Sequence, residues 1–185
     1  MHPRSDALTE EIRREFPAFR IRPKAESLLQ RAIDVALKVL TLHGQNEYLT
    51  RYHTVLGDTL WVPTAWPESD DERRYVLLRH ERVHLRQRRR YGTIGMALIY
   101  LLPVFPLGLA WGRARIEWEA YVETLRATAE VYGLAAARDP SLHAYLVRQF
   151  TSAAYGWMWP FPRVIQRWID EALVEIAATT PPVGG

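Results

Sequence analysis

Apolar positions along the chain recur mostly at the spacing of an amphipathic helix, and this pattern predicts a largely helical protein. In the second predicted helix, Leu29, Ile33, Ala36, Leu37 and Leu40 form one apolar stripe. The boundaries of the predicted helices are supported by proline and acidic residues at their expected starts and by basic residues at some of their ends. The predicted helices cover residues 6–16, 23–42, 69–90, 107–132, 139–154 and 162–177.

One stretch departs from the helical pattern. Tyr48–Val55 and Thr59–Val62 are rich in β-branched and aromatic residues, and the turn-forming pair Gly57 and Asp58 lies between them. They predict a β-hairpin. We therefore expect an α+β fold, predominantly α-helical, forming a single domain over 1–178, with a disordered tail at 179–185.

The helix that follows the hairpin contains the sequence His80-Glu81-Arg82-Val83-His84, an HExxH motif. Residues four apart lie on one face of a helix, one turn apart, so the two imidazoles can bind one Zn²⁺ ion. Glu81, about 100° round the helix, can then reach a water molecule on that ion. On the same helical wheel the histidines face inward and the arginines of 79–90 face solvent. The alternative is that both histidines are hydrogen-bonded core residues without a metal.

A third ligand is expected downstream. The position six residues after His84, where metzincins place a third histidine, is Arg90, which excludes that class. In the helix over 107–132, Glu117 is the only acid on an apolar face, whereas Glu119 shares its side with charged residues. A buried carboxylate needs a cation. Glu117 is therefore predicted to be the ligand; a buried ion pair with an arginine is the alternative.

With these residues in place, residues 48–132 resemble the gluzincins, the zinc metallopeptidases that include thermolysin, and especially their small, minimal forms. The resemblance rests on the hairpin, the HExxH motif and the ExxA sequence from Glu117 to Ala120. It implies a zincin-like fold, hydrolysis of a peptide or protein substrate, zinc on His80, His84 and Glu117, and Glu81 as general base. It also implies that the hairpin aligns substrate, with Tyr48, Tyr52 and His53 on its first strand.

Tyr121 stands where the family often has an Asp or Asn that supports a ligand histidine, so a phenol is expected in that role. An oxyanion partner is not apparent from the motif, and Tyr155, His143 and His53 are candidates by residue type alone. Arg82 and Arg86 replace uncharged residues of the family, which indicates a motif helix exposed on one side.

The segment 91–112 is 22 residues long and has no charged residue. As one helix it could span a bilayer, but that would place His84 and Glu117 on opposite sides. We expect it to turn back near Pro103 and Pro106 as an apolar helical hairpin. Two interpretations remain open: packing within a soluble core, or association with the inner face of a membrane through the arginines at both ends.

Composition narrows the function classes. The chain has no cysteine, which excludes disulfides, thiolate metal sites and thiol catalysis. The N-terminal residues show no secretory signal, so a cytoplasmic location is expected. The net charge is +3, yet six Arg and one Glu lie within 79–90, so the rest of the chain sums to −2. This arginine face has no aromatic platform beside it, which argues against a nucleic-acid partner. A catalytically inactive, metal-stabilised or membrane-associated binding module remains the alternative to a peptidase.

Overall fold

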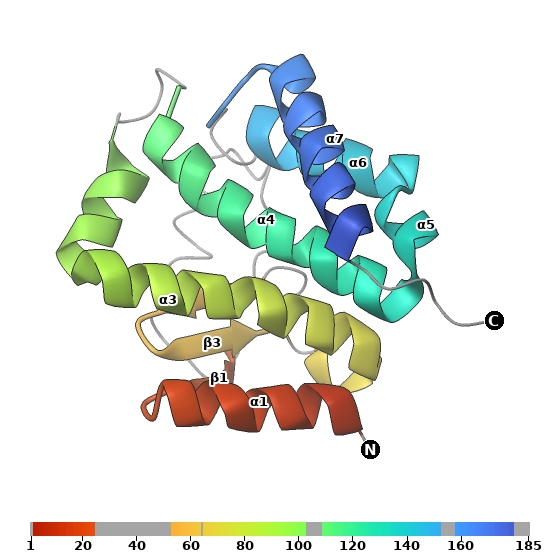
Figure 1. Ribbon diagram of the computed structural model, residues 1–185. Coiled ribbons are helices and arrows are strands. Elements are labelled where there is room, and N and C mark those ends of the chain that lie inside the picture. The colour runs from red at the N-terminus through yellow and green to blue at the C-terminus, as the bar shows by residue number, and fades with distance from the viewer. Residues whose placement is uncertain (1, 25–52, 64, 103–108, 153–157, 180–185) are drawn as a thin grey trace. The chain divides into compact units, whose positions relative to one another are not determined.

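The computed structural model describes residues 2–24, 53–63, 65–102, 109–152 and 158–179 (Figure 1). The described chain is mainly helical with one small sheet, which confirms the predominantly helical α+β class. Its contacts divide into two compact units, Met1–Glu81 and Arg82–Gly185, and the boundary falls within a helix. The single domain expected over 1–178 stays a prediction. Of the tail expected at 179–185, Thr179 instead ends the last helix, which tertiary packing extends, and 180–185 lie outside the described residues.

Helix α1 (Pro3–Glu15) begins the first unit and confirms the first predicted helix, three residues earlier than expected. Proline fits the first turn of a helix, where its missing N–H leaves no hydrogen bond unmade. The carboxylate of Asp71 accepts hydrogen bonds from the N–H groups of Arg4 and Ser5, each 2.9 Å long. A side chain distant in sequence therefore caps α1, and Leu8 and Ile12 are buried on its inner face.

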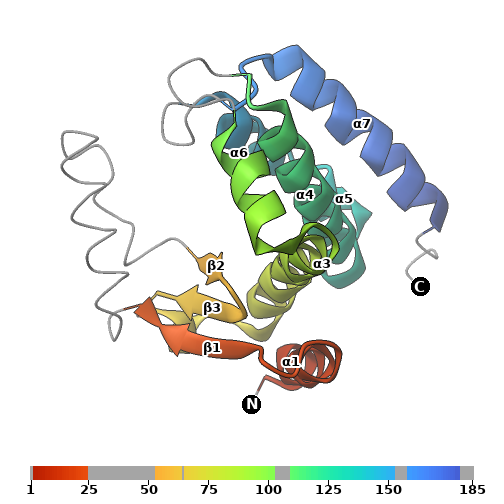
Figure 2. The ribbon, with the colours of Figure 1, turned by 90° about the vertical axis from the view of Figure 1, so that its left-hand side faces the viewer.

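The sheet has three strands, β1 (Arg20–Pro23), β2 (Thr54–Leu56) and β3 (Thr59–Val62), with β3 in the middle (Figure 2). β2 and β3 are antiparallel around Gly57, whose φ of 63° suits glycine. The predicted hairpin is thus confirmed over 54–62. His53, expected on its first strand, precedes that strand, and residues 48–52 lie outside the described residues.

Strand β1 pairs in parallel with β3 and was not expected. The sequence analysis placed the start of a helix at Pro23, and this start is wrong because Pro23 is the last residue of β1. A four-residue strand with two arginines has no local signal of its own; it forms because Leu60 and its neighbours on β3 offer a partner. Residues 25–42 of the predicted helix lie outside the described part of the chain.

Helix α3 (Asp71–Leu101) follows a short 3₁₀ turn at Trp66–Glu68. Asp70 caps it, because its carboxylate accepts a 2.7 Å hydrogen bond from the N–H of Arg73, as the sequence predicts. The helix is interrupted at Gly92, where φ is 71° and ψ is 169°. Only glycine adopts this conformation readily, so Gly92 separates the motif segment from a second helical segment, residues 93–101, which we call the apolar arm.

The second unit continues with α4 (Trp111–Tyr132), α5 (Leu134–Ala137), α6 (Pro140–Thr151) and α7 (Pro162–Thr179). The three longer helices confirm the predictions, with α4 starting later and α6 ending earlier than expected. Asp139 caps α6 by accepting a 2.7 Å hydrogen bond from the N–H of Ser141. The short α5 was not predicted; it follows Gly133, whose φ is 86°.

Helices α4, α6 and α7 pack around an aromatic core in the second unit (Figure 1). The ring of Phe150 lies 6.3 Å from that of Trp118 and 6.4 Å from that of Trp168, in edge-to-face geometry that aromatic pairs favour. Leu125 and Ile169 are fully buried beside them. This core fixes α4, the helix that carries the predicted third ligand.

The apolar arm lies against the beginning of α4. A side chain added at Gly112 would meet Ile99 at 3.1 Å, so glycine permits this close approach. The chain therefore reverses between the arm and α4, as a helical hairpin over 91–112 requires, although its turn at 103–108 lies outside the described residues. Within the residues that the structure describes, no helix is long and apolar enough to cross a membrane.

Candidate metal centre

The HExxH residues lie on α3, well before the interruption at Gly92. His80 and His84 are one turn apart and partly buried, and Glu81 between them is only 6% exposed. On the opposite side Arg86, Arg89 and Arg90 are exposed, as the helical wheel predicts. Helical geometry alone thus presents both imidazoles on one face.

Helix α4 supplies the carboxylate. His80, His84 and Glu117 each offer one ligand atom, and these atoms all lie within 4.8 Å of one another. Glu119, two residues on, is exposed, which agrees with the choice of Glu117 over Glu119. These three residues form a group that could hold a metal ion.

The distances suit one ion. The Nε2 atom of His84 and the Oε2 atom of Glu117 are 3.8 Å apart. Two ligands of a tetrahedral zinc ion are about 3.4 Å apart, so this pair needs to close by only about 0.4 Å. Two imidazoles and one carboxylate also match the donor set of catalytic zinc sites, which leave the fourth position open. The residues present therefore fit a zinc ion.

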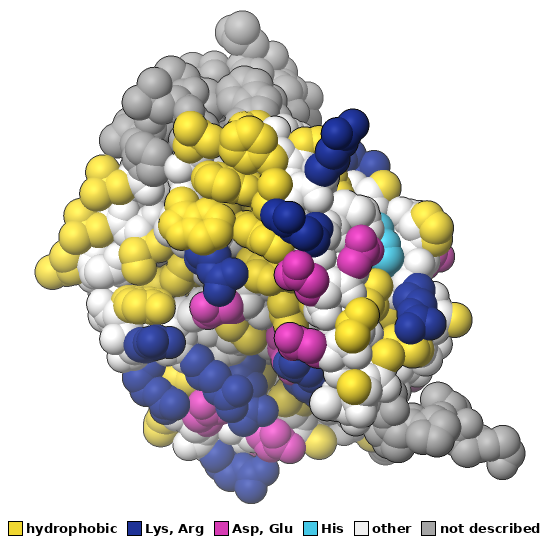
Figure 3. All heavy atoms as spheres, turned by 45° about the horizontal axis from the view of Figure 1, so that its top comes forward, with side chains coloured by type: hydrophobic (Ala, Val, Ile, Leu, Met, Phe, Trp, Pro, Cys, Tyr) yellow, Lys and Arg dark blue, Asp and Glu magenta, His cyan; other side chains and the backbone are white. Residues whose placement is uncertain are grey.

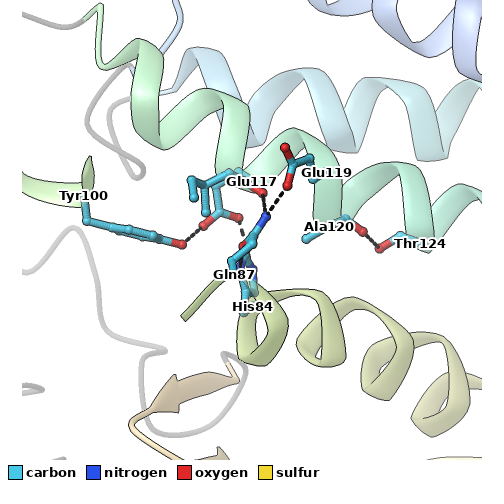
Figure 4. A network of polar contacts seen from close by, with 8 residues as sticks. His84, Gln87, Tyr100, Glu117, Glu119, Ala120 and Thr124 are labelled. Atoms are coloured by element: carbon cyan, nitrogen blue, oxygen red, sulfur yellow. Dashed lines mark hydrogen bonds and ion pairs between the residues drawn. The ribbon is translucent and has the colours of Figure 1, made fainter. Parts of the chain in front are cut away.

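Gln87 holds the ring of His84 (Figure 4). Its Oε1 atom lies 2.9 Å from Nδ1 of His84, and its Nε2 atom donates 2.9 Å hydrogen bonds to the carbonyl of Ile116 and the carboxylate of Glu119. Because the amide nitrogen makes both donor contacts, Oε1 must accept, and Nδ1 of His84 must carry the hydrogen. In this tautomer Nε2 of His84 carries the lone pair that can bind a metal.

Tyr100 supports the carboxylate ligand from the apolar arm. Its hydroxyl donates a short hydrogen bond to Oε1 of Glu117, while Oε2 of Glu117 faces His84 (Figure 4). The glutamate is thereby oriented with one oxygen held and the other directed at the histidine.

Sequence reasoning missed both supporting residues. Gln87 carried a signal that could have been used, because it is an uncharged polar residue on the histidine face of a helix whose other polar residues are mainly arginines. Tyr100 carried no such signal. Its hydrogen bond to Glu117 depends on a chain reversal that brings together two residues 17 positions apart in the sequence.

The residues predicted to support the site lie in varied places. Tyr121 is buried, and its ring packs 5.6 Å from that of Phe150. His143 lies on α6 with its Nε2 atom 2.9 Å from the carbonyl of Ala137. Neither belongs to the group of three ligands, so their roles at the site stay predictions. Tyr155 lies outside the described residues.

The expected substrate-aligning strand is described only in part, because Tyr48 and Tyr52 lie outside the described residues. His53 immediately precedes β2, and its ring packs edge-on against Trp66 at 5.4 Å. Burial, together with the nearby positive charge of Lys24, lowers the pKa of His53 to about 4. His53 is therefore neutral at pH 7, and within the described residues its Nε2 atom has no hydrogen-bond partner.

Comparison of the chain with protein-family models, curated proteins and solved structures finds no match.

Proposed function

We propose that this chain is a zinc-dependent metallopeptidase of the gluzincin type, with a zincin-like fold. The observation that carries the proposal is the convergence of His80, His84 and Glu117 within 4.8 Å. The tautomer imposed by Gln87 and the orientation imposed by Tyr100 support it, because hydrogen-bonded ligands are typical of functional metal sites.

His80, His84 and Glu117 would hold the ion and leave one position open for water and substrate. When bound, zinc lowers the pKa of its water toward about 7 and polarises the carbonyl of the scissile bond. The two imidazoles bind as neutral ligands and the carboxylate of Glu117 contributes one negative charge. A bound zinc ion would therefore keep a net positive charge with which to polarise the carbonyl. This chemistry also requires a carboxylate close to the ion. Glu81, within the motif and 6% exposed, meets that requirement in this proposal.

Glu81 is the general base in this proposal. Its carboxylate accepts the proton of the attacking water as the new C–O bond forms, and it then donates that proton to the leaving amine as the C–N bond breaks. The proton thus passes from water to the amine through one side chain, and no other co-reactant is needed. Burial favours this role, because a carboxylate shielded from bulk water passes its proton to the reacting groups and does not lose it to solvent.

The substrate in this proposal is a peptide or protein in extended form. Among the described residues β2 is an edge strand, because the sheet order places β3 between β1 and β2. An edge strand offers unpaired backbone groups to which an extended peptide can add. The proposal includes a substrate-aligning role for Tyr48, Tyr52 and His53, which precede β2 in the chain.

The variant Glu81→Gln tests the mechanism, because it keeps the shape of the side chain and removes its basicity. We expect it to bind zinc as the wild type does and to lose nearly all hydrolysis of unfolded protein and peptide-library substrates. Glu175→Gln, an exposed position on α7, is the matched control and should keep both properties. Full hydrolysis by Glu81→Gln would overturn the mechanism, whereas a zinc-loaded wild type that cleaves none of these substrates would favour a metal-stabilised binding module.

A further inference from the structure

Exposed apolar side chains gather in one part of the second unit. Among the described residues ten large hydrophobic side chains are exposed, and six of them belong to residues 91–111. Ile94, Leu98 and Leu102 are 78%, 53% and 54% exposed, and they follow one another at four-residue spacing, on one side of the apolar arm. We call these three residues the apolar ridge. A solvent-exposed ridge of this kind marks an interaction site on a protein surface.

The arm is held by its other side. On a helical wheel Tyr100 is separated by about 120° to 160° from the members of the ridge, and it donates its hydrogen bond to Glu117. Ile99 faces the close approach at Gly112. These contacts hold one side of the arm to α4, and the ridge lies on the other side, exposed among the described residues.

Positive charge flanks the apolar segment. Arg86, Arg88, Arg89 and Arg90 precede it without an intervening acid, and residues 91–112 carry no charge at all. The guanidinium of Arg90 lies 5.3 Å from the ring centre of Tyr91, and that of Arg115 lies 5.8 Å from the ring centre of Trp111. Figure 3 shows hydrophobic side chains gathered on one face, with Lys or Arg side chains and some Asp or Glu side chains at their edge.

We propose that the apolar ridge and its flanking arginines dock this protein onto the surface of a membrane that contains anionic lipids. The ridge enters the boundary between headgroups and acyl chains, and the arginines bind lipid phosphates. Tyr91 and Trp111, each exposed and each beneath an arginine, suit the headgroup level, where aromatic rings with a polar edge are favoured. The arm lies in the interface and does not cross the bilayer, as the absence of a long apolar helix in the described residues requires.

Charge complementarity favours a lipid surface over a second copy of the chain as the occupant. Pairing two ridges would bring together two copies of residues 82–112, which contain five arginines and no acid. An anionic lipid surface instead attracts this excess of positive charge, and each arginine near the surface contributes about 1 kcal/mol of attraction, or about fivefold in affinity. Docking on a lipid surface is a binding property that goes beyond the proposed peptidase activity.

Sedimentation with vesicles tests this docking on the full chain. We expect wild-type protein to pellet with vesicles of phosphatidylcholine and phosphatidylglycerol and much less with pure phosphatidylcholine, and added salt should weaken binding. Ile94→Glu/Leu98→Glu should reduce binding at least about tenfold, since it removes buried apolar area and adds repelled charge. Val174→Glu is the matched control because Val174 is 71% exposed on α7, and it should bind as the wild type does.

The arginines are tested separately. Arg89→Gln/Arg90→Gln should weaken binding to anionic vesicles about 25-fold, while Arg163→Gln/Arg167→Gln on α7 should not. Both positions of each pair are exposed, so circular dichroism and thermal melting should show unchanged folds. Three results would overturn the docking: no pelleting of the wild type with either vesicle, equal binding by Ile94→Glu/Leu98→Glu, or a dimer of the wild type that this variant dissociates in the absence of lipid.

Discussion

Removing the support that Gln87 gives to His84 should weaken zinc binding without removing a ligand. The variant Gln87→Met keeps the length of the side chain and deletes its hydrogen bonds. The lost contact between Oε1 of Gln87 and Nδ1 of His84 is 2.9 Å long and fixes both the ring orientation and its tautomer. Outer partners of this kind contribute about 10- to 100-fold in metal affinity, so we expect a loss of about 1.4–2.7 kcal/mol.

The apoprotein should be destabilised as well, by about 1–2 kcal/mol. Gln87 is 4% exposed, and its amide also bonds Ile116 and Glu119, so methionine leaves two buried or partly buried acceptors with fewer partners. The dissociation constant for zinc should therefore be measured below the melting temperature, by competition with a chromophoric chelator at fixed pH, because zinc binding is coupled to proton release.

Gln149→Met is the matched control for this prediction. Gln149 lies on α6, is 5% exposed, and its Oε1 atom has no hydrogen-bond partner among the described residues. The chemical change is the same and the metal ligands are untouched, so zinc affinity should equal that of the wild type. Equal affinity in Gln87→Met and the wild type, or equal losses in both methionine variants, would refute the assignment of Gln87 as the support of His84.

Two further predictions concern the backbone and pH. Gly92→Ala should lower the free energy of unfolding by about 1–3 kcal/mol and weaken zinc binding through the displaced Tyr100, because alanine disfavours φ of 71° with ψ of 169°. Gly95→Ala, within the helical arm, should instead be neutral or stabilising, and chemical denaturation of both variants measures the contrast; a neutral Gly92→Ala would contradict the reasoning. The depressed pKa of His53 means that the folded state excludes a proton that the unfolded chain binds below pH 6.5. His53 therefore costs stability as pH falls from 6.5 to 4, by at most about 3 kcal/mol, and His53→Phe should flatten that part of the stability profile; an unchanged slope would show that His53 is not buried in its neutral form.

Much of the helical framework was predictable because its signals are local. Asp70 and Asp139 each cap a helix through a side chain that bonds the next turn, and such a bond needs no tertiary partner. The hairpin at Gly57 is local in the same sense. Strand β1 was not predictable, since Arg20–Pro23 becomes a strand only through parallel pairing with β3, a partner about 40 residues away.

The residues of the candidate site likewise fall into those that local sequence predicts and those that depend on tertiary structure. His80 and His84 share a face because a helix repeats every 3.6 residues, and Glu117 stood out as the single acid on an apolar face of its own helix. Tyr100 could not be found this way, because its bond to Glu117 requires the interruption at Gly92 and the reversal of the chain. Periodicity predicts which residues share a face, but it does not predict which faces meet.

The segment 91–112 shows where composition alone misleads. Its apolar content fitted packing in a soluble core as well as contact with a membrane. The exposure of Ile94 and Leu98 does not fit burial in a core, and no described helix is both long and apolar enough to span a bilayer. Only the structure distinguishes the side of the arm that bonds α4 from the side that faces outward.

The zinc content of purified protein tests the central claim most directly. After loading with zinc and removal of the excess by gel filtration, elemental analysis should find one zinc per chain in the wild type and in Glu119→Ala, and none in Glu117→Ala or His84→Ala. Circular dichroism of each variant confirms that the chain is folded. A wild type that retains no zinc, or a folded Glu117→Ala that retains one per chain, would contradict the assignment of His80, His84 and Glu117 as the metal centre.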